Sequence, residues 1–473
     1  MSLKLERKTR QELIALVSEK LENYFASVSQ LPVNPQPTLQ EVKKRLSQYT
    51  FENPLVPSIV LEDIDNSLRE FQLHTSHPAY FGVFNPNPAF MGILAELLTA
   101  AYNPQLASST SSLYCIEIEN QLIRFFADKF TLPKTSEGTF TSGGNEANFT
   151  AIACALQNTI SGYSNQGIGN AKPVIYTSSE THHSIKKSAK VSGLGLNSVR
   201  VLPVDEKLKF RVDTLESAIA QDLKNGFLPL MIIATAGSTS AGVFDPINEL
   251  AAIAQKHNLW LHLDAAWGGS AVLLPEFESL FKGCEFADSI TLDAHKWLSI
   301  PMGCSLFLTR HKGLLKRTFQ ADDSPYMPSH AEHETTQPYL ESFQWSRRAL
   351  GLKLFMTLAV AGLSGMQNTL RHQIAIGNEL RKLLTENSWL VVNDSPLPVV
   401  CFVSQSHPVV NRKEGLKQIA KLVGDSGKSW LTTTELSFSD NTVLRAGISN
   451  FATQNEHLDI LIQALNQARG TVS

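Results

Sequence analysis

The chain has 473 residues, of which 43% are hydrophobic and 18% are charged, and its 41 basic and 44 acidic side chains give a formal net charge of -3. A chain of this length exceeds the size at which a single hydrophobic core stops growing, so we expect more than one domain. The nearly balanced charge, without a long run of either sign, argues against a nucleic-acid-binding protein.

The five cysteines are widely spaced and form no CxxC pair or Cys/His cluster, which argues against a zinc site. They favour buried thiols in a reducing compartment. The N-terminal segment carries charges through its apolar positions, unlike a signal peptide, and no later window approaches the ~18 apolar residues of a membrane span. We therefore expect a cytoplasmic protein without a metal site or a membrane partner.

Residues 1–75 combine amphipathic helix patterns with proline-rich links such as LPVNPQPTLQ. This composition suits a helical arm that lies on another surface better than it suits an independent core. From about Thr139 to Arg310, short β-rich runs alternate with helical stretches, which predicts a mainly parallel sheet covered on both faces. The expected strands are KPVIYTS, VRVLPV, LMIIATAG, LWLHLDAA, DSITLDA and CSLFLTR.

The sequence indicates one crossover between these strands most clearly. MIIATAG ends at Gly237, after which Asp245 and Pro246 are expected to cap and open the helix ELAAIAQKH. After about Leu363, helix and strand patterns alternate again and predict a smaller α/β lobe. We therefore expect an N-terminal arm at 1–75, a large domain at 76–363 and a small C-terminal domain at 364–473.

The ends of the expected strands carry candidate functional residues, because ligands of open parallel sheets bind beyond the carboxyl ends of the strands. KPVIYTS leads to His182, MIIATAG contains Thr235, and LWLHLDAA delivers Asp264. DSITLDA leads to His295 and Lys296. These side chains are expected to meet at one edge of the sheet.

Lys296 is followed by Trp297 and Leu298, whose apolar side chains favour burial of the lysine stem. Burial disfavours the ammonium form and makes a neutral amine, a nucleophile for carbonyls, accessible. The alternative is a lysine that extends its ammonium into solvent from the end of a strand. Upstream, Gly143 and Gly144 precede the helical run FTAIACAL, where backbone N–H groups can bind a phosphate, although two glycines there are also ordinary turn residues.

A lysine for an imine, an acid at the sheet edge and a phosphate-binding helix start are the requirements of pyridoxal 5'-phosphate (PLP). Each feature alone has another explanation: Asp264 could cap a helix, and His182 could be an ordinary surface or core histidine. Their combination in this order predicts a PLP enzyme.

Six segments resemble the PLP-dependent group II amino acid decarboxylases, which include the aromatic amino acid, histidine, glutamate and cysteine sulfinate decarboxylases. They are HPAYF (77–81), TSGGNEAN (141–148), ETHHS (180–184), LHLDAAWGGS (261–270), DAHKWL (293–298) and SRRALGLKLF (346–355). The resemblance runs from about residue 50 to the C-terminus. It implies the fold-type I, aspartate-aminotransferase-like architecture, and a homodimer with active sites at the subunit interface.

The resemblance also implies roles for single residues around the cofactor ring. Lys296 matches the lysine that binds the cofactor as an imine, and His182 matches the histidine that stacks on the ring, with the next histidine in the chain as the competing candidate. Asp264 would favour a protonated ring nitrogen, because an opposite charge nearby stabilises the charged form. Ala266 matches the small residue on the other face of the ring. Thr235 is either a positioning residue beside that carboxylate or an ordinary strand residue.

Further residues are expected around the phosphate and towards the partner subunit. The residues expected near the phosphate are Gly143, Gly144, Asn145, His295 and Asp293. Family members more often carry Ser or Thr at the Asn145 position. Ser346 lies in a segment that, in related enzymes, reaches the cofactor of the partner subunit.

The reaction implied is decarboxylation of an L-amino acid to the corresponding amine and CO2. The segment FQADDSPY (319–326) resembles the mobile catalytic loop of these decarboxylases, and its Tyr326 is a candidate acid, with Tyr339 as the substitute if the alignment is shifted. An aminotransferase or an aldehyde synthase on the same fold is the alternative.

The expected substrate is an aromatic or medium-sized L-amino acid. Tyr80 and Phe81 match aromatic positions that line the side-chain pocket of the aromatic decarboxylases. The small polar run ASSTSS and the segment AAWGGS point instead towards enzymes with other substrates, so an acidic or diamino substrate stays open.

Overall fold

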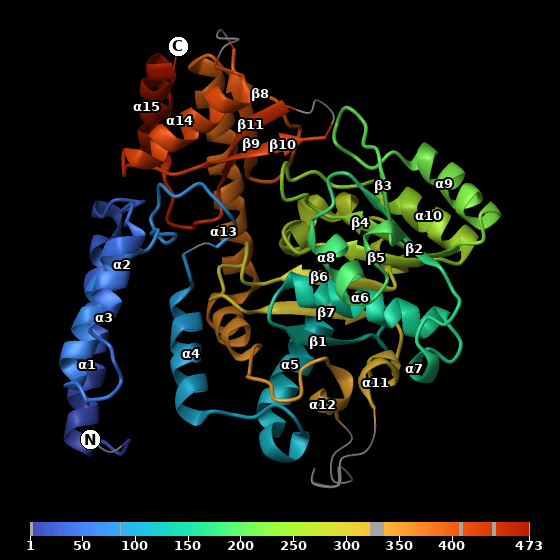
Figure 1. The fold of residues 1–473 in the computed structure, drawn as a ribbon, viewed down its shortest axis with the longest axis horizontal. Coiled ribbons are helices and arrows are strands. Elements are labelled where there is room, and N and C mark those ends of the chain that lie inside the picture. Colours follow the sequence, from blue (N-terminus) through green and yellow to red (C-terminus); the bar gives the residue numbers. More distant parts are fainter. Residues whose placement is uncertain (1–2, 86, 322–334, 406–409, 438–440, 473) are drawn as a thin grey trace.

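The structure is a computed structural model that describes residues 3–85, 87–321, 335–405, 410–437 and 441–472. Within these residues, seven strands form one sheet in the order β1-β7-β6-β5-β4-β2-β3 and four strands form a second sheet in the order β10-β11-β9-β8. The smaller sheet lies at one end of the molecule, above the larger one in Figure 1.

The large sheet contains the mainly parallel core that the sequence predicts. Its strands are β1 (Glu137–Thr141), β2 (Pro173–Ser178), β3 (Val199–Leu202), β4 (Leu228–Thr235), β5 (Trp260–Asp264), β6 (Ser289–Asp293) and β7 (Ser305–Thr309). Strands β3, β2, β4, β5 and β6 pair in parallel, whereas β7 is antiparallel to both β6 and β1. All six expected strands are therefore present, and β1 is an additional edge strand that the sequence pattern did not single out.

Both faces of the large sheet are covered, which explains why central strands such as β4 are mostly apolar. Successive side chains of a strand point to opposite faces. Met231 and Ile233 of β4 accordingly belong to the core beneath α6 (Gly144–Thr159) and α8 (Ser184–Val191). Ile232 and Ala234 belong to the core on the other face, with α5 (Ser109–Lys129), α9 (Val212–Lys224) and α10 (Ile247–His257).

The expected start of α10 is wrong, because Pro246 is the N-cap and the helix begins at Ile247. Asp245 does not cap the helix: its carboxylate accepts the backbone N–H of Thr235 at 2.8 Å and that of Phe210 at 2.9 Å. Burial raises the pKa of Asp245 to about 7. The residue therefore fixes the end of β4, because a buried backbone N–H must find an acceptor.

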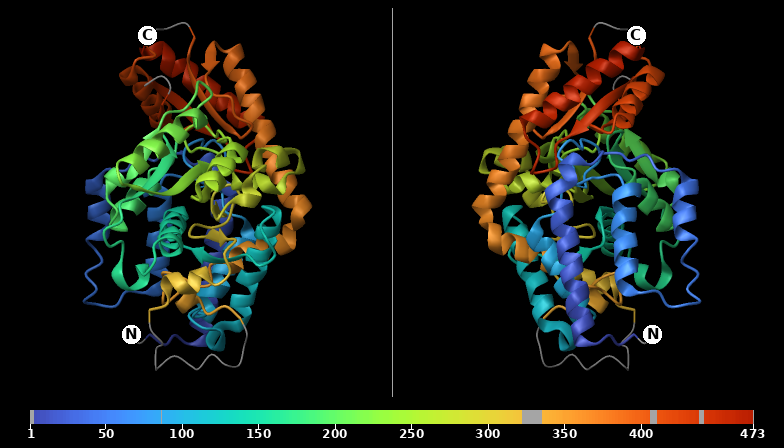
Figure 2. Two further views of the ribbon diagram at one scale, coloured as in Figure 1. Left: turned by 90° about the vertical axis from the view of Figure 1, so that its right-hand side faces the viewer. Right: turned by 90° about the vertical axis from the view of Figure 1, so that its left-hand side faces the viewer.

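The small lobe is an antiparallel sheet covered by two helices. Its strands are β8 (Trp389–Val391), β9 (Val399–Ser404), β10 (Thr432–Leu436) and β11 (Asn441–Gly447), and its helices are α14 (Lys413–Asp425) and α15 (Asn455–Val472). The long helix α13 (Leu352–Glu386) connects it to the large lobe, as Figures 1 and 2 show. Its helical geometry is interrupted at Gly362, where φ is 65°.

The N-terminal arm consists of α1 (Arg7–Ser27), α2 (Leu39–Leu46) and α3 (Pro57–Phe71) and runs along one side of the molecule (Figure 1). Lys20 of α1 and Arg69 of α3 both pair with Asp65. Neither α1 nor α3 has a buried residue, so their apolar side chains remain largely uncovered. The remaining helices are α4 (Phe90–Tyr102), α7 (Tyr163–Gln166), α11 (Leu314–Phe319) and α12 (Pro338–Glu341). In the described part of the chain, no helix combines the length and apolarity that crossing a membrane requires.

A buried ion pair anchors the segment that leads into α13. Arg347 donates to Glu119 of α5 at 2.7 Å, and the other oxygen of that carboxylate accepts the backbone N–H groups of Leu350 and Gly351. Burial raises the pKa of Glu119, and the guanidinium of Arg347 opposes this effect. The pair fixes where the chain enters α13, because one carboxylate binds both the guanidinium and two backbone N–H groups of this segment.

We expect Glu119→Gln to lower the free energy of unfolding by about 3–5 kcal/mol, because Arg347 would be left as an uncompensated buried charge. Urea denaturation followed by circular dichroism measures this change. As a control, Glu276→Gln breaks the solvent-exposed pair with Arg371 and should change stability by less than about 1 kcal/mol. Equal stability of the two variants would contradict the assigned role of the buried pair.

Candidate active site

The carboxyl edge of the large sheet brings together the residues expected at the strand ends. Asp264 ends β5 and is only 4% exposed. It pairs in register with Thr235 on β4 and with Thr291 on β6. Lys296 follows three residues after the end of β6, so the lysine and this carboxylate lie at the same edge because their strands are parallel neighbours.

Lys296 is paired with Asp293, the last residue of β6. Its Nζ lies 2.9 Å from Asp293 Oδ2, and the lysine side chain keeps 19% of its surface exposed. The chain turns here, since Lys296 N–H donates to the Asp293 carbonyl. The lysine therefore reaches into the site rather than extending freely into solvent from the strand end.

An aromatic stack holds the two turns that carry the site. The ring of Trp267, next to Ala266, lies 3.7 Å from the ring of Phe84 and 5.1 Å from that of Trp297, the neighbour of Lys296. The Ala266 carbonyl also accepts the backbone N–H of Asp293. Because these rings are buried and stacked, both turns have a rigid apolar support.

The start of α6 faces these turns. Glu146 accepts the N–H and hydroxyl of Ser142, while the first N–H groups of the helix, those of Gly144 and Asn145, have no intrahelical acceptor. A Cβ added to Gly144 would meet both carboxylate oxygens of Asp293 at 2.8 and 2.9 Å. Asp293 therefore lies against the helix N-terminus, where a negative charge is stabilised.

The residue before the helix, Gly143, has open space around it. A Cβ at this position would meet nothing closer than His295 Cε1, at 4.0 Å. The imidazole of His295 is buried, with Nδ1 3.0 Å from the Cys304 carbonyl oxygen. Burial lowers the pKa of His295, and the carboxylate of Asp293 opposes this effect. Asn145 is exposed at the start of the helix.

His182 and Thr235 also lie at this edge. His182 is exposed, and its Nδ1 lies 2.9 Å from the Ser184 hydroxyl at the start of α8. His183, the competing candidate, is also exposed, with its ring centroid 6.5 Å from that of His182. The Thr235 hydroxyl lies 3.3 Å from the Thr181 hydroxyl.

Tyr80 and Phe81 are placed elsewhere. Both belong to the hydrophobic core of the small lobe, where the Tyr80 ring stacks on Trp430 at 5.3 Å. Burial raises the pKa of Tyr80 to about 12, and its hydroxyl is bonded to Asn85 and to the backbone N–H of Val83. The aromatic residue of this segment that does approach the site is Phe84, through the stack described above.

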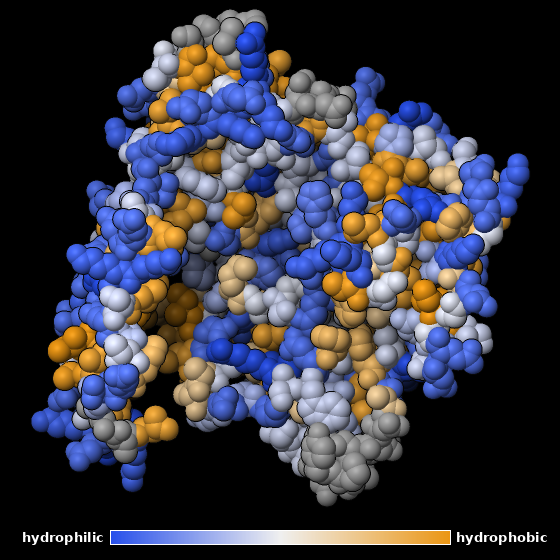
Figure 3. All heavy atoms as spheres, in the orientation of Figure 1, coloured by the Kyte–Doolittle hydropathy of each residue, from blue (hydrophilic) through white to orange (hydrophobic). Residues whose placement is uncertain are grey.

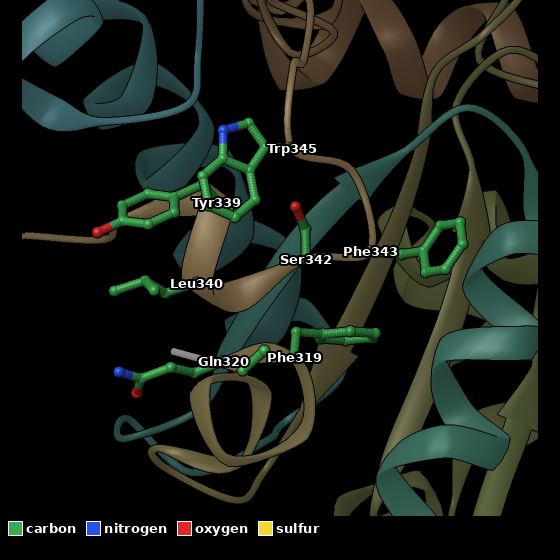
Figure 4. Close-up of a pocket in the computed structure, with 8 residues that line it drawn as sticks. Phe319, Gln320, Tyr339, Leu340, Ser342, Phe343 and Trp345 are labelled. Carbon is green, nitrogen blue, oxygen red and sulfur yellow. The ribbon is translucent and has the colours of Figure 1, made fainter. Parts of the chain in front are cut away.

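The structure describes only some of the residues expected in the catalytic loop and towards the partner subunit. Tyr326 lies outside the described residues, and Ser346 is exposed ahead of α13. Tyr339 is buried in α12 beside Trp345, at a ring distance of 5.0 Å, and lines the cavity in Figure 4 together with Phe319 of α11. That cavity is distinct from the edge that carries the paired lysine, since none of its lining residues belongs to the turns after β5 and β6.

Two further residues at the site, Asn148 and Arg445, were missed by the sequence analysis. Asn148 of α6 donates to Asp264 Oδ2 at 2.9 Å, and it also contacts His262. Arg445 of β11 is buried over the Phe84 ring, with Cζ 4.6 Å from the ring centroid, and donates to the Gly82 carbonyl. Asn148 closes the TSGGNEAN motif, so its position was visible, but only the fold shows what it contacts.

The residues present fit pyridoxal phosphate. The space around Gly143 leaves the start of α6 open to a phosphate, and the partly exposed amine of Lys296 can reach an aldehyde. The exposed ring of His182 leaves an aromatic face free for stacking. Fold and site together therefore define a PLP-dependent enzyme.

Comparison with known proteins identifies the group within that class. Residues 41–405 match the family model described as the pyridoxal-dependent decarboxylase conserved domain. The chain belongs to the pyridoxal-dependent decarboxylase family and is an enzyme of that kind.

Individual relatives cover nearly the whole chain. This chain is 29% identical to a tyrosine decarboxylase of Papaver somniferum, and the alignment covers 82% of this chain and 78% of that protein. It is 26% identical to a phenylacetaldehyde synthase of Arabidopsis thaliana over 94% of this chain and 92% of that protein. The structure of Oryza sativa TDC with PLP and tryptamine superposes with a TM-score of 0.93 at 21% identity, covering 100% of this chain and 99% of the other, which establishes the expected fold.

The contact between Gly144 and Asp293 generates a paired prediction. Gly144→Ala should lower the free energy of unfolding by about 1–3 kcal/mol, because its Cβ would overlap the carboxylate and something must shift. Gly143→Ala should leave stability nearly unchanged, since its φ of 175° is ordinary extended backbone and its surroundings are open. Thermal unfolding of both variants without cofactor measures the difference, and the reverse ranking would contradict the arrangement.

Proposed function

We propose that the protein decarboxylates an aromatic or medium-sized L-amino acid to the corresponding amine and CO2, using PLP. The observation that carries this proposal is the meeting of Lys296, Asp264 and the start of α6 at one sheet edge in a member of the decarboxylase family. Family membership supports the reaction type. The nature of the relatives supports the substrate class.

We propose the following cofactor contacts for the residues of the site. Lys296 would hold the cofactor through its aldehyde, Asp264 would bind the ring nitrogen, and His182 and Ala266 would enclose the ring. The residues that hold the phosphate or lie beside it are Gly143, Gly144, Asn145, His295 and Asp293. Thr235 supports the strand end beside the ring-facing carboxylate, and Ser346 serves the site of a partner subunit.

Bound PLP supplies an electron sink for the electron pair that remains at Cα when CO2 departs. The chain contributes the fixed charges around it. The carboxylate of Asp264 is buried and hydrogen-bonded, so it is held in place before the substrate binds. Asp293 holds the side chain of Lys296 beside the helix start, with Nζ 2.9 Å from Oδ2. We propose Tyr326 as the acid that returns a proton to Cα, with the buried Tyr339 as the weaker candidate.

The substrate class rests on the relatives, among which is a tyrosine decarboxylase. The segment ASSTSS, which had favoured other substrates, starts α5, where Ser109 contacts Gln337 of the same chain. Ser109 is thus bonded within the subunit, whereas Thr110 and Ser111 are exposed. An acidic or diamino acid is the alternative substrate.

An aldehyde synthase is the second candidate function, favoured by the similarity to a phenylacetaldehyde synthase. The two activities differ in the product, because an amine with CO2 indicates simple decarboxylation, whereas an aldehyde with ammonia indicates the alternative. The proposed acid, Tyr326, favours the amine, since proton return to Cα completes a simple decarboxylation.

The purified holoenzyme should release CO2 and amine from L-tyrosine, L-tryptophan or L-phenylalanine, and little from L-glutamate or L-2,4-diaminobutyrate. Amine, aldehyde and CO2 are quantified in the same reactions. Lys296→Ala should abolish turnover, and borohydride reduction followed by peptide mapping should find the pyridoxyl group on Lys296. Lys353→Ala, which removes another largely buried lysine, should leave the labelled position unchanged. A label on any other lysine, or aldehyde as the main product, would overturn the assignment.

We also propose that the protein is a homodimer. The arm exposes apolar side chains, among them Ile14, Ile59 and Leu68, and Figure 3 shows apolar residues gathered along it. The neighbouring helix α4 exposes Leu97 and Tyr102. A concentration of exposed apolar side chains of this kind is typical of a face that another subunit covers.

Leu97→Asp should shift the protein to an inactive monomer, because a charge would be buried at the subunit contact. Sedimentation at assay concentration together with activity measures this. Leu223→Asp on α9 is the matched control, since Leu97 and Leu223 are similarly exposed, at 60% and 55%. A fully active wild-type monomer would refute the proposal.

The location and the domain division are proposals as well. All five cysteines are free thiols in the structure, which supports a reducing compartment such as the cytoplasm. The two separate sheets and the interruption at Gly362 support the division into 1–75, 76–363 and 364–473. Residues 79–81 nevertheless pack in the core of the small lobe. This core therefore includes residues from outside the segment 364–473.

A further inference from the structure

Asn148 lies near the start of α6 and is 1% exposed, with its side-chain amide directed at the edge of the large sheet. Its Nδ2 donates to Asp264 Oδ2 at 2.9 Å and to the Ser184 hydroxyl at 2.8 Å. Its Oδ1 accepts from His262 Nε2 and from the Thr291 hydroxyl, both at 3.0 Å. Each amide hydrogen and each lone pair therefore has a partner.

The orientation of this amide is fixed by its neighbours. A carboxylate can only accept hydrogen bonds, so the atom that faces Asp264 must be Nδ2. With the amide reversed, Asn148 Oδ1 would face a carboxylate oxygen without a proton between them, which is repulsive in a buried site. The correct orientation in turn requires His262 Nε2 to carry its proton.

His262 extends the network into the core. Its Nδ1 lies 2.8 Å from the Ser289 hydroxyl, which accepts the indole N–H of Trp260 at 2.9 Å. Burial lowers the pKa of His262 to about 4, so the imidazole is neutral and Nδ1 accepts the Ser289 proton. The hydrogen bonds of this network therefore all run in one direction. They lead from the indole of Trp260 through Ser289, His262 and Asn148 to the carboxylate of Asp264.

The second amide hydrogen of Asn148 links this hydrogen-bond network to His182. It is accepted by the hydroxyl of Ser184, which lies 2.9 Å from His182 Nδ1, and the Ser184 backbone N–H also donates to that nitrogen. One side chain thus joins the carboxylate at the end of β5 to the histidine before α8.

We propose that Asn148 is a positioning residue that fixes the carboxylate of Asp264 and the imidazole of His182 relative to each other, and so keeps the cofactor ring nitrogen protonated. This inference rests on the proposed function of the site and assigns a role to a residue outside the set of cofactor contacts. Among the described residues, the donor to Asp264 Oδ1 is the Ala266 N–H, at a longer distance of 3.2 Å. The donation from Asn148 therefore fixes the orientation of the buried carboxylate.

Two variants of Asn148 test the inference in the full-length protein. Asn148→Leu has a similar volume but no donor, and it should weaken PLP binding about tenfold, as expected for loss of a hydrogen bond to a charged group. With PLP labelled with 15N in the ring, the NMR shift of the bound cofactor should move from the protonated towards the unprotonated value. Asn148→Asp should lower the thermal midpoint, because two carboxylates would then face each other.

The double variant Asn148→Asp/Asp264→Asn separates positioning from packing. It restores one carboxylate and one amide to the pair, so its thermal midpoint should recover relative to Asn148→Asp alone. The ring nitrogen should nevertheless stay unprotonated, because the carboxylate would occupy the wrong side of the pair. The double variant provides this readout even if Asn148→Leu does not fold.

Thr291→Val is the matched control, because it removes one donor to Asn148 Oδ1 and leaves the donor from His262 in place. Its ring-nitrogen signal should stay protonated. A protonated ring nitrogen in Asn148→Leu or in the double variant would overturn the inference while leaving the proposed function intact. A wild-type protein that binds no PLP at Lys296 would instead overturn the proposed function itself.

Discussion

The site depends on one constraint, the common direction of neighbouring parallel strands. Because β4, β5 and β6 run in the same direction, their last residues are adjacent in register, and Thr235, Asp264 and Thr291 lie in a row. The turn after β6 then carries Lys296 back to the same edge. The antiparallel strand β7 lies between β6 and the edge strand β1 and adds no carboxyl end to that row, since it runs the opposite way. Every charged group of the site is thereby brought within reach of one ligand.

Two buried carboxylates at this edge are stabilised in different ways. Asp293 is paired with Lys296 and lies against the N-terminus of α6, so its charge is balanced by a cation and by the helix dipole. Asp264 has no cation as a hydrogen-bonding partner among the described residues and relies on donors from Asn148 and the chain itself. This difference suits the proposed roles, because the first carboxylate accompanies a lysine that must react, whereas the second must stay charged towards a ring nitrogen.

The small lobe contributes to the site through the chain that crosses between the lobes. Phe81 donates its backbone N–H to the Trp430 carbonyl and is buried in the small-lobe core, while Phe84, three residues later, stacks on Trp267 of the large lobe. Arg445 of β11 covers the same ring and donates to the carbonyls of Thr239 and Ser240. A change in the orientation of the small lobe would therefore be transmitted to the aromatic stack that supports Lys296.

The sequence by itself determined the strands, the parallel sheet and the residues at its edge, because strand periodicity and turn residues are local properties. Lys296 and Asp264 were predicted for that reason, and the resemblance of the motifs added their roles. Only the tertiary structure decided which partner each polar group has. Asp245, expected to cap α10, bonds instead to the ends of other segments. Asn148 is a helix residue like others in its pattern, and its role arises from contacts with residues 36 to 143 positions away in the chain. Such contacts are not encoded in local spacing, since they depend on which strands become neighbours and on which face of the sheet a helix packs.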